Sequence, residues 1–442
     1  MRSERPPLRL ALAGFGTVGM GLADILEQNR EKLTARAGRE IRIHSVLVRD
    51  QAKARTRPLP SGARLCADVS ELVQDARVDV VVELMGGLEM PRRLIRAALE
   101  AGKHVVTANK ALLAEEGEEI FRLAGQHGLH LGYEASVCGG VPVIQVLREG
   151  LAANKILALA GILNGTCNYI LSSMSGEGLS FEAALKRAQS LGLAEADPSL
   201  DIEGWDSAHK LALLIRLAWG INYPFKHMPV TGITRVTPED IRFAGEFGCN
   251  IKLLGQAALT EDRQSGRTRL DAWVFPSLVP ESNPLSQVGQ AYNALRVEGN
   301  AVGAVFLHGL GAGGPPTGSA VAADLLRIAL GTGPHNTGYA GSGRADLEIM
   351  PPLESASGYY FRLTVPDRAG VLKVVAAAMA EQQISVAQVI QKSQRGGGVV
   401  PLVIMTHQTT ARAVEAALAG LKSSGILTEA PVYYKVLAAG GE

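Results

Sequence analysis

The chain has 442 residues, of which 47% are hydrophobic and 20% are charged, and its formal net charge at pH 7 is +1. This length predicts about two to four domains with sizeable cores, and the balanced charge gives no support to a nucleic acid as a partner. The apolar runs are too short to span a bilayer, residues 1–7 lack the apolar core of a signal peptide, and four scattered cysteines without a CxxC pair argue against zinc or disulfides and favour a reducing cytoplasm.

The first third of the chain alternates between strands and helices. Such alternation predicts βαβ units and a doubly wound parallel sheet, and therefore an α/β dinucleotide-binding (Rossmann) domain over residues 1–140. The third apolar run is continuous and rich in valine, as is typical of a parallel strand covered on both faces. We expect strands at 8–13, 41–48, 78–84, 104–107 and 130–133, and helices at 17–27, 69–74, 90–101 and 112–127.

The pattern changes at about residue 141. The mixture of elements that follows predicts a second, α+β domain with an open sheet over residues 141–310. A glycine-rich turn then leads to an apolar helix, and the region 311–330 is expected to complete the first domain, with 331–357 as a linker. We expect strands at 155–163, 252–259, 268–275 and 301–308, and helices at 181–191, 206–219, 238–247 and 319–330.

The last segment, residues 358–442, is short and regular. Its elements follow the order βαββαβ, which is typical of the ferredoxin-like fold. We expect strands at 359–365, 385–391, 399–406 and 432–436, and helices at 371–382 and 410–423.

Residues 14–19 read Gly-Phe-Gly-Thr-Val-Gly, a G-x-G-x-x-G motif between a predicted strand and a predicted helix. Gly14 permits a tight turn, Gly16 lets the backbone approach a pyrophosphate, and Gly19 allows the helix to pack closely on the strand. The N–H groups and the dipole of the helix N-terminus favour a bound phosphate. The motif predicts a dinucleotide site formed by Gly14, Phe15, Gly16, Thr17, Val18 and Gly19.

The end of the second predicted strand bears on which cofactor binds. Arg49 stands where an acidic residue would contact the ribose of NAD, and a guanidinium suits the 2′-phosphate of NADP. This position favours NADP, although the neighbouring Asp50 keeps NAD open. Lys53 is either a further phosphate ligand or a solvated loop charge.

Two lysines stand out as candidates for chemistry. Lys110 follows a predicted strand at the edge where open α/β sheets bind ligands, but a solvated lysine at a helix start fits equally well. Lys210 lies four residues after Asp206, where an apolar helix enters a core. The two side chains either form a plain ion pair or converge on one ligand. The preceding segment, 195–206, is dense in carboxylates.

Several stretches in chain order resemble homoserine dehydrogenases, and together they span most of the chain. The Asn-Gly-Thr and Ala-Glu-Ala-Asp-Pro stretches are far more specific than the glycine motif. The resemblance implies NAD(P)-dependent interconversion of aspartate 4-semialdehyde and L-homoserine by a cytoplasmic homodimer or homotetramer that acts in amino-acid biosynthesis. The matching stretches are 14–19, 107–110, 134–137, 161–168, 192–198, Asp201 and 206–210.

The resemblance also implies a role for each residue. Lys210 is expected to donate and accept the proton at the reacting carbon, and Lys110 to position substrate and cofactor. Glu195 is expected to bind the substrate amino group, and Asp206 to bind substrate and orient Lys210 with support from Asp201. Further implied contacts are those of Gly192, Asn164 and Thr166 to substrate, and of Lys110, Gly192 and Gly311 to cofactor.

Glu134 and three following carbonyl groups resemble the sodium site of this family. A carboxylate with several carbonyl oxygens suits a hard, weakly charged cation. The sequence departs from the family at residues 138–140, which read Cys-Gly-Gly, and we expect Cys138 to be a small packing residue. The expected carbonyl groups are those of Val137, Gly139 and Val141.

Residues 359–372 resemble the opening of an ACT domain, a ferredoxin-like module that binds free amino acids. The resemblance implies a small-molecule effector, with threonine as the candidate, bound near Asp367, Ala369 and Gly370. The alternative is a module that only holds subunits together.

Two other functions fit part of the same pattern. One is another Rossmann dehydrogenase of an amino acid or a semialdehyde, in which Cys138 could serve as a nucleophile. The other is a non-catalytic sensor of NAD(P) and an amino acid, which would need neither the two lysines nor the acid cluster.

Overall fold

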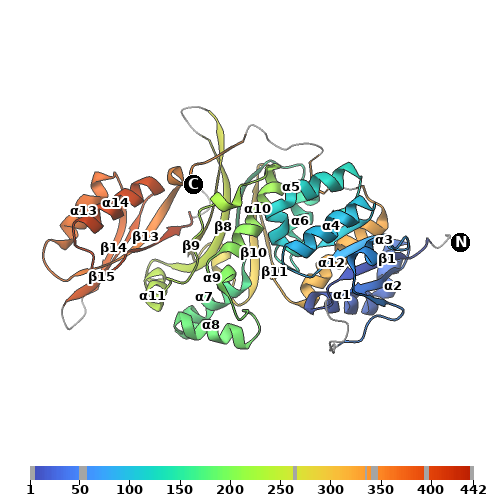
Figure 1. Cartoon of the computed structure of the whole chain (residues 1–442). Coiled ribbons are helices and arrows are strands. Elements are labelled where there is room, and N and C mark those ends of the chain that lie inside the picture. The colour runs from blue at the N-terminus through green and yellow to red at the C-terminus, as the bar shows by residue number, and fades with distance from the viewer. Residues whose placement is uncertain are drawn as a thin grey trace. The chain divides into compact units, whose positions relative to one another are not determined.

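The computed structural model describes residues 5–48, 57–261, 266–333, 336–339, 347–392 and 398–438 (Figure 1). The contacts divide the chain into two compact units. Unit 1 comprises Met1–Leu157, His209–Lys226 and Asn293–Asp346, and unit 2 comprises Ala158–Ala208, His227–Tyr292 and Leu347–Glu442. Among the described residues, no helix is long and apolar enough to cross a membrane.

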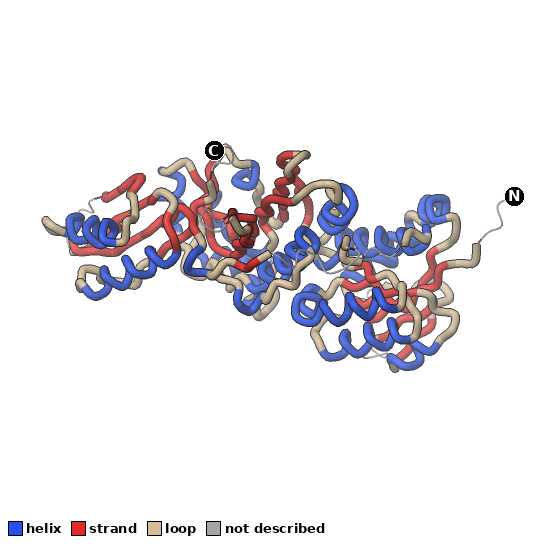
Figure 2. Tube along the Cα trace, turned by 90° about the horizontal axis from the view of Figure 1, so that it is seen from above, coloured by secondary structure: helices blue, strands red, loops and turns tan. Residues whose placement is uncertain are grey.

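Unit 1 is built on a six-stranded parallel sheet in the order β3-β2-β1-β4-β5-β6. Helices lie on both sides of these strands (Figure 2). The predicted doubly wound sheet is therefore confirmed. Its strands are β1 Leu8–Ala13, β2 Ile41–Leu47, β3 Arg64–Cys66, β4 Val80–Glu83, β5 His104–Thr107 and β6 Leu131–Gly132, and its helices are α1 Thr17–Gln28, α2 Arg30–Ala37, α3 Val69–Gln74, α4 Glu89–Glu100 and α5 Lys110–Gln126.

A late segment of the chain completes this unit. Helix α12 (Gly314–Leu330) packs on α1 so closely that their backbones touch. A Cβ atom at Gly21 would lie 2.3 Å from the carbonyl oxygen of Gly314, and one at Gly318 would lie 2.7 Å from the nitrogen of Leu22. Only glycine permits this crossing. Behind it, Leu22, Val321 and other apolar side chains share one buried core.

The remainder of unit 1 includes part of α10 and several short elements. Asn336, within the segment expected to be a linker, packs on unit 1, because its amide oxygen accepts from Leu131 N at 2.8 Å and its amide nitrogen donates to Leu129 O at 2.8 Å. The remaining elements are η1 Glu134–Ser136, α6 Val143–Gln145, η2 Val146–Gly150, α10 Trp205–Trp219, η3 Phe225–His227, β10 Tyr292–Gly299 and β11 Gly303–Leu310.

Unit 2 contains a long antiparallel hairpin, β8 with β9, whose register runs from Cys249↔Pro280 to Glu261↔Thr268. Both strands are longer than predicted. Strand β7 pairs with β8 on one side, and β17 pairs in parallel with β9 on the other. The elements are β7 Ile156–Ile162, α7 Gly165–Glu177, α8 Phe181–Ser190, α9 Ser199–Ile202, α11 Pro238–Glu246, β8 Cys249–Glu261, β9 Thr268–Pro280, η4 Pro284–Gln287, β12 Glu348–Ile349 and η5 Pro352–Glu354.

The C-terminal segment of unit 2 has the order of elements that the sequence predicts. Its strands follow the order β17-β13-β15-β14, all antiparallel to their neighbours. Helices α13 and α14 lie side by side on one face of this sheet (Figure 1), and the layers enclose a separate apolar core. The elements are β13 Ala356–Pro366, α13 Val371–Glu381, β14 Val386–Gln391, β15 Val399–Thr406, β16 Thr409–Thr410, α14 Ala411–Ser423 and β17 Val432–Val436.

The crossing of α1 with α12 generates a stability prediction. Gly21→Ala should lower the free energy of unfolding by about 1–3 kcal/mol, because overpacking against backbone atoms costs that much. The matched control is Gly125→Ala on α5, where an added Cβ would meet nothing within 4 Å. It should raise the free energy of unfolding by about 0.5–1 kcal/mol. Urea unfolding measures both, and equal effects would contradict the close contact.

Candidate active site

The turn between β1 and α1 has the geometry of a phosphate-binding loop. Gly14 has a φ of +97°, and a Cβ there would lie 2.6 Å from the carbonyl oxygen of Leu84. A Cβ at Gly19 would lie 2.5 Å from the oxygen of Gly14, whereas Gly16 has no atom near its Cβ position. Among the described side chains, none caps the N-terminus of α1. The turn therefore offers an open approach to backbone N–H groups.

A buried carboxylate organises the neighbouring strand ends. Glu83 closes β4 and is fully buried. Its carboxylate accepts from Thr107 Oγ1 at 2.6 Å and from Met85 N at 2.7 Å. Thr107 Oγ1 in turn accepts from Asn109 N at 3.0 Å, and the Asn109 side chain caps α5 by accepting from Leu112 N at 3.1 Å. Burial raises the pKa of Glu83.

The Glu83 network holds Lys110, the first residue of α5, at the carboxyl edge of the sheet. This is the edge at which open α/β sheets bind ligands. Sequence reasoning missed Glu83. The sequence did offer a signal for it, because residues 80–83 read Val-Val-Val-Glu. An acid at the end of a buried strand needs hydrogen-bond partners, and such an acid therefore indicates a polar network.

Helices α5 and α10 pack against each other within unit 1. Ala114 and Ala212 share a small buried cluster. Further along, the Arg216 guanidinium lies 4.6 Å from the centroid of the Phe121 ring. Residue numbers rise together along both helices, so their N-terminal ends lie at the same end of the pair.

In this parallel arrangement the two candidate lysines both lie on the N-terminal side of the contact between the helices. Lys110 precedes Ala114 by one helical turn, and Lys210 precedes Ala212 by two residues. Lys210 is only 8% exposed. Its neighbour His209 packs edge-on against Phe225, with ring centroids 4.9 Å apart.

In unit 2, one asparagine bridges two candidate carboxylates. Asn164 caps α7, and its Oδ1 accepts from Cys167 N at 2.8 Å. Its Nδ2 donates to Asp201 Oδ1 and to Asp206 Oδ2, both at 2.7 Å. Both amide hydrogens are therefore used to hold carboxylates. Asp206 and Lys210 lie one turn apart on the same face of α10.

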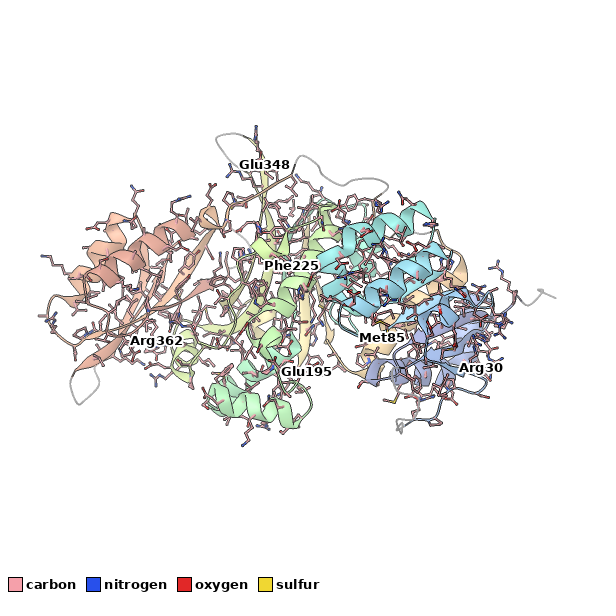
Figure 3. All side chains as sticks on the ribbon, in the orientation of Figure 1. Arg30, Met85, Glu195, Phe225, Glu348 and Arg362 are labelled. Carbon is pink, nitrogen blue, oxygen red and sulfur yellow. The ribbon has the colours of Figure 1, made fainter. Side chains whose placement is uncertain are left out.

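The loop after α8 presents another carboxylate to solvent. Gly192 turns the chain with a φ of +70°. The hydroxyl of Thr166 donates to Leu193 O at 2.7 Å, and Gln189 Nε2 donates to the backbone oxygen of Glu195 at 3.1 Å. The loop backbone is thus held at two points. The Glu195 side chain is exposed (Figure 3) and pairs with no described residue.

Glu134 lies buried in unit 1 at the start of η1. Its two carboxylate oxygens accept from Ile144 N at 2.9 Å and from Gln145 N at 2.8 Å. Burial, with the nearby charge of Asp324, raises the pKa of Glu134 to about 8. Burial also raises the pKa of Asp324, which accepts from Glu134 N at 2.9 Å, to about 6.

The loop after Glu134 approaches Gly311. Cys138 and Gly139 both have left-handed backbones, with φ of 57° and 52°. A Cβ at Gly139 would lie 2.4 Å from the oxygen of Gly311, and Gly140 N donates to Leu310 O at 3.0 Å. The predicted cation loop and the predicted cofactor residue Gly311 are therefore neighbours. Cys138 is fully buried, as a packing residue should be.

No described group of three or more His, Cys, Asp or Glu side chains could hold a metal ion. A cation at this loop would therefore depend on backbone carbonyl oxygens as well as on Glu134. Of the three expected carbonyl groups, that of Val141 also accepts from Val143 N at 2.7 Å.

Other predicted site residues fall elsewhere. Arg49, Asp50 and Lys53 lie outside the described residues. Asp367, Ala369 and Gly370 form an exposed turn at the start of α13, where Gly370 has a φ of +91°. Asp367 N donates to Gly398 O at 3.1 Å.

A parallel sheet with a glycine turn at its carboxyl edge defines a dinucleotide-binding domain. Lysines on two packed helices, together with clustered carboxylates, supply groups for proton transfer. The fold and site thus define an NAD(P)-dependent oxidoreductase.

Comparison with known proteins narrows this class. The NAD-binding domain of homoserine dehydrogenase matches residues 14–134, and the homoserine dehydrogenase family matches residues 142–326. The homoserine dehydrogenase of Neisseria gonorrhoeae is 41% identical over 423 residues, which cover 94% of this chain and 95% of that protein. The chain belongs to the homoserine dehydrogenase family.

Solved structures agree. A homoserine dehydrogenase from Thiobacillus denitrificans has a TM-score of 0.92 at 41% identity, covering 99% of this chain and 100% of that chain. A hyperthermophilic archaeal homoserine dehydrogenase in complex with NADPH has a TM-score of 0.60 at 26% identity, covering 74% of this chain and 98% of that chain. Membership of this family argues against the two alternatives, namely another amino-acid or semialdehyde dehydrogenase and a non-catalytic sensor of NAD(P) and an amino acid.

Proposed function

We propose that the protein catalyses the NAD(P)H-dependent reduction of aspartate 4-semialdehyde to L-homoserine and the reverse oxidation. The observation that carries this proposal is the parallel packing of α5 on α10, because Lys110 and Lys210 both lie on the N-terminal side of this contact, in the unit that holds the glycine turn. The names of the relatives support the substrate.

The proposed chemistry assigns the proton to the protein. A bound nicotinamide supplies the hydride. As the aldehyde carbon accepts hydride, negative charge develops on its oxygen, and the ammonium of Lys210 stabilises that charge and donates a proton. Lys110 positions substrate and cofactor. In the oxidation, neutral Lys210 takes the proton back.

The carboxylates are proposed to hold the amino-acid end of the substrate. Glu195 is exposed and unpaired with any described residue, as a ligand for the substrate ammonium should be. Asn164 Nδ2 donates to Asp206 Oδ2, and the Asp206 carboxylate is proposed to bind substrate and to orient Lys210. Asp201 supports the same asparagine. Gly192 and Thr166 shape the loop that carries Glu195.

For the cofactor we propose NADP in preference to NAD. The guanidinium of Arg49, two residues beyond β2 in the sequence, suits a 2′-phosphate, and one structural relative is in complex with NADPH. The glycine turn 14–19 would hold the pyrophosphate, with Gly311 close by.

The reaction is tested by following NADPH and NADH oxidation with aspartate 4-semialdehyde, with and without phosphate. We expect phosphate-independent turnover that is faster with NADPH. Lys210→Ala should lower kcat by at least about 10²-fold, the usual worth of a positioned acid, and leave NADPH affinity unchanged. The control is Lys186→Ala, an exposed lysine on α8. Strict phosphate dependence, or full activity of Lys210→Ala, would refute the proposal.

We also propose a monovalent cation, Na⁺, at Glu134 with the carbonyl groups of Val137, Gly139 and Val141. A carboxylate whose pKa is raised to about 8 by burial and a neighbouring acid gains most from a cation. Because the folded protein keeps the Glu134 proton up to about pH 8 and the unfolded chain loses it near 4.5, this group's contribution to stability is present at low pH and is lost as pH rises.

Sodium must displace this proton, so its stabilising effect should grow as pH rises. We expect the Tm in NaCl to exceed that in choline chloride of equal strength by more at about pH 9 than at about pH 6. Glu134→Gln should remove the difference. Equal Tm values in both salts at both pH values would count against the site.

We propose that residues 358–442 form an ACT regulatory domain that binds threonine at the turn containing Asp367, Ala369 and Gly370. The βαββαβ order and the exposed N-terminus of α13 support this proposal. We propose residues 1–140 with 311–330 as the cofactor domain, 141–310 as the catalytic domain, 331–357 as the linker, and a cytoplasmic homodimer or homotetramer. The exposed Val386 and Val389 on edge strand β14 are suited to pairing between copies.

L-Threonine should therefore lower the rate of NADPH oxidation with aspartate 4-semialdehyde. Asp367→Ala should relieve this inhibition and leave the uninhibited rate unchanged, because its turn serves the effector alone. Light scattering in the same buffers measures the molar mass and so distinguishes a homodimer from a homotetramer. If the rate does not respond to threonine, methionine, isoleucine or lysine, the regulatory proposal is contradicted and the segment is a module that only holds subunits together.

A further inference from the structure

A cavity of about 210 Å³ lies inside unit 2, between the long hairpin and the C-terminal segment. Strand β9 forms one wall with Trp273 and Phe275. Strands β13 and β17 contribute Tyr359, Tyr433 and Lys435. None of these residues belongs to the candidate active site or to the turn at Asp367.

A buried ammonium lines this cavity. Lys435 is only 3% exposed, and its Nζ donates to Ser355 Oγ at 3.0 Å, its one hydrogen bond among the described residues. Ser355 Oγ in turn donates to Asp271 Oδ2 at 2.8 Å. The ammonium carries three N–H donors, so two remain for another acceptor. Burial lowers the pKa of Lys435 to about 8.

Aromatic rings surround the same ammonium. Its Nζ lies 4.6 Å from the centroid of the Trp273 ring, 5.6 Å from that of Tyr359 and 5.9 Å from that of Phe275. Aromatic faces attract a cation without using its hydrogens. The rings therefore stabilise the positive charge of Lys435 and leave the N–H groups of its ammonium available as hydrogen-bond donors.

Two phenol hydroxyl groups add further donors. Within the described ranges, the hydroxyls of Tyr359 and Tyr433 make no hydrogen bond, although Tyr359 is 1% exposed. A buried tyrosine hydroxyl ordinarily has a partner. Burial and the charge of Glu415 raise the pKa of Tyr433, so its hydroxyl stays protonated and can donate. Glu415, which also lines the cavity, is itself exposed.

We propose that this cavity binds a small organic carboxylate with an apolar body. The carboxylate would accept from Lys435 Nζ and the two phenol hydroxyls, and the apolar body would pack against Trp273 and Phe275. Lys435 Nζ and the two phenol hydroxyls offer donors to the cavity, and its walls are mainly apolar, so a carboxylate with an apolar body would satisfy both. The proposal does not depend on the proposed reaction.

The carboxylate could belong to an amino acid or to a simple acid. Glu415, close enough to shift the pKa values of both tyrosines, would attract the ammonium of an amino acid. Calorimetry on the full chain with L-leucine and with 4-methylpentanoate separates the two sources, and 4-methylpentanamide is the uncharged control. Saturable binding of either acid supports the site. No binding of either acid, or equal binding of the amide, would overturn it.

Variants locate the binding. Lys435→Met should weaken affinity by at least about tenfold, the usual worth of a charge-assisted contact. The control is Lys252→Met, which removes another buried lysine of unit 2 whose pKa is also lowered to about 8 and whose Nζ donates to Val288 O at 2.6 Å. It should bind as the parent does. Tyr433→Phe, which removes only a hydroxyl, gives a second reading if Lys435→Met fails to fold.

Thermal unfolding establishes that each variant is folded before titration. Undiminished affinity in both folded Lys435→Met and Tyr433→Phe would refute the assignment. So would an equal loss in folded Lys252→Met.

Discussion

The packing of α5 against α10 is the constraint on which the candidate site depends. Lys110 is the first residue of α5, whereas Asp206 and Lys210 lie in the first two turns of α10, and a different network holds the start of each helix. Asn109 and Glu83 fix the start of α5, whereas Asn164 holds Asp206 at the start of α10. A shift of either helix along its axis would separate the lysines by 1.5 Å for each residue of slip. Ala114 and Ala212 share a small buried cluster with Phe225 at this contact.

Unit 1 contains several acidic side chains that are almost fully buried. Glu83, Glu134 and Asp324 are all almost fully buried, and burial raises the pKa of each. Backbone N–H groups or a threonine hydroxyl bond to each of them and offset part of the desolvation. Glu83 ends β4 and Glu134 follows β6, whereas Asp324 lies within α12 and accepts a hydrogen bond from Glu134 N. The fold thus places two buried acids with raised pKa values, Glu83 and Glu134, near the sheet edge where ligands would bind.

The sequence predicts the architecture well where periodicity is strong. Strands 8–13 and 104–107 and helix 69–74 have the predicted bounds, because apolar period and turn residues agree there. Helix α2 was missed because Arg30–Ala37 has almost no apolar stripe. Helix α7 was missed because its glycines, serines and asparagine favour turns when read locally, and a cap by Asn164 with tertiary packing overrides them. Strand β10 was also absent from the expected elements.

The candidate site was less predictable than the fold. Motifs identified the lysines and carboxylates, but spacing alone left an ion pair and a ligand site equally open. The bridging role of Asn164 depends on Asp201 and Asp206 folding back onto residue 164, a long-range contact that local pattern does not encode. Lys435 and Tyr433 belong to no motif, and only the tertiary structure brings them to one cavity with Trp273.

The parallel pairing of β17 with β9 covers part of an edge that would otherwise be bare. It joins Lys435 to Ser277 and Val436 to Leu278, and beside it Arg362 binds the buried Asp240 of α11 at 2.7 Å. A chain cut short at residue 355 would uncover main-chain donors and acceptors along β9 and leave the carboxylate of Asp240 without its cation. Such a fragment would be prone to aggregation, because the exposed edge could pair with the strands of another chain.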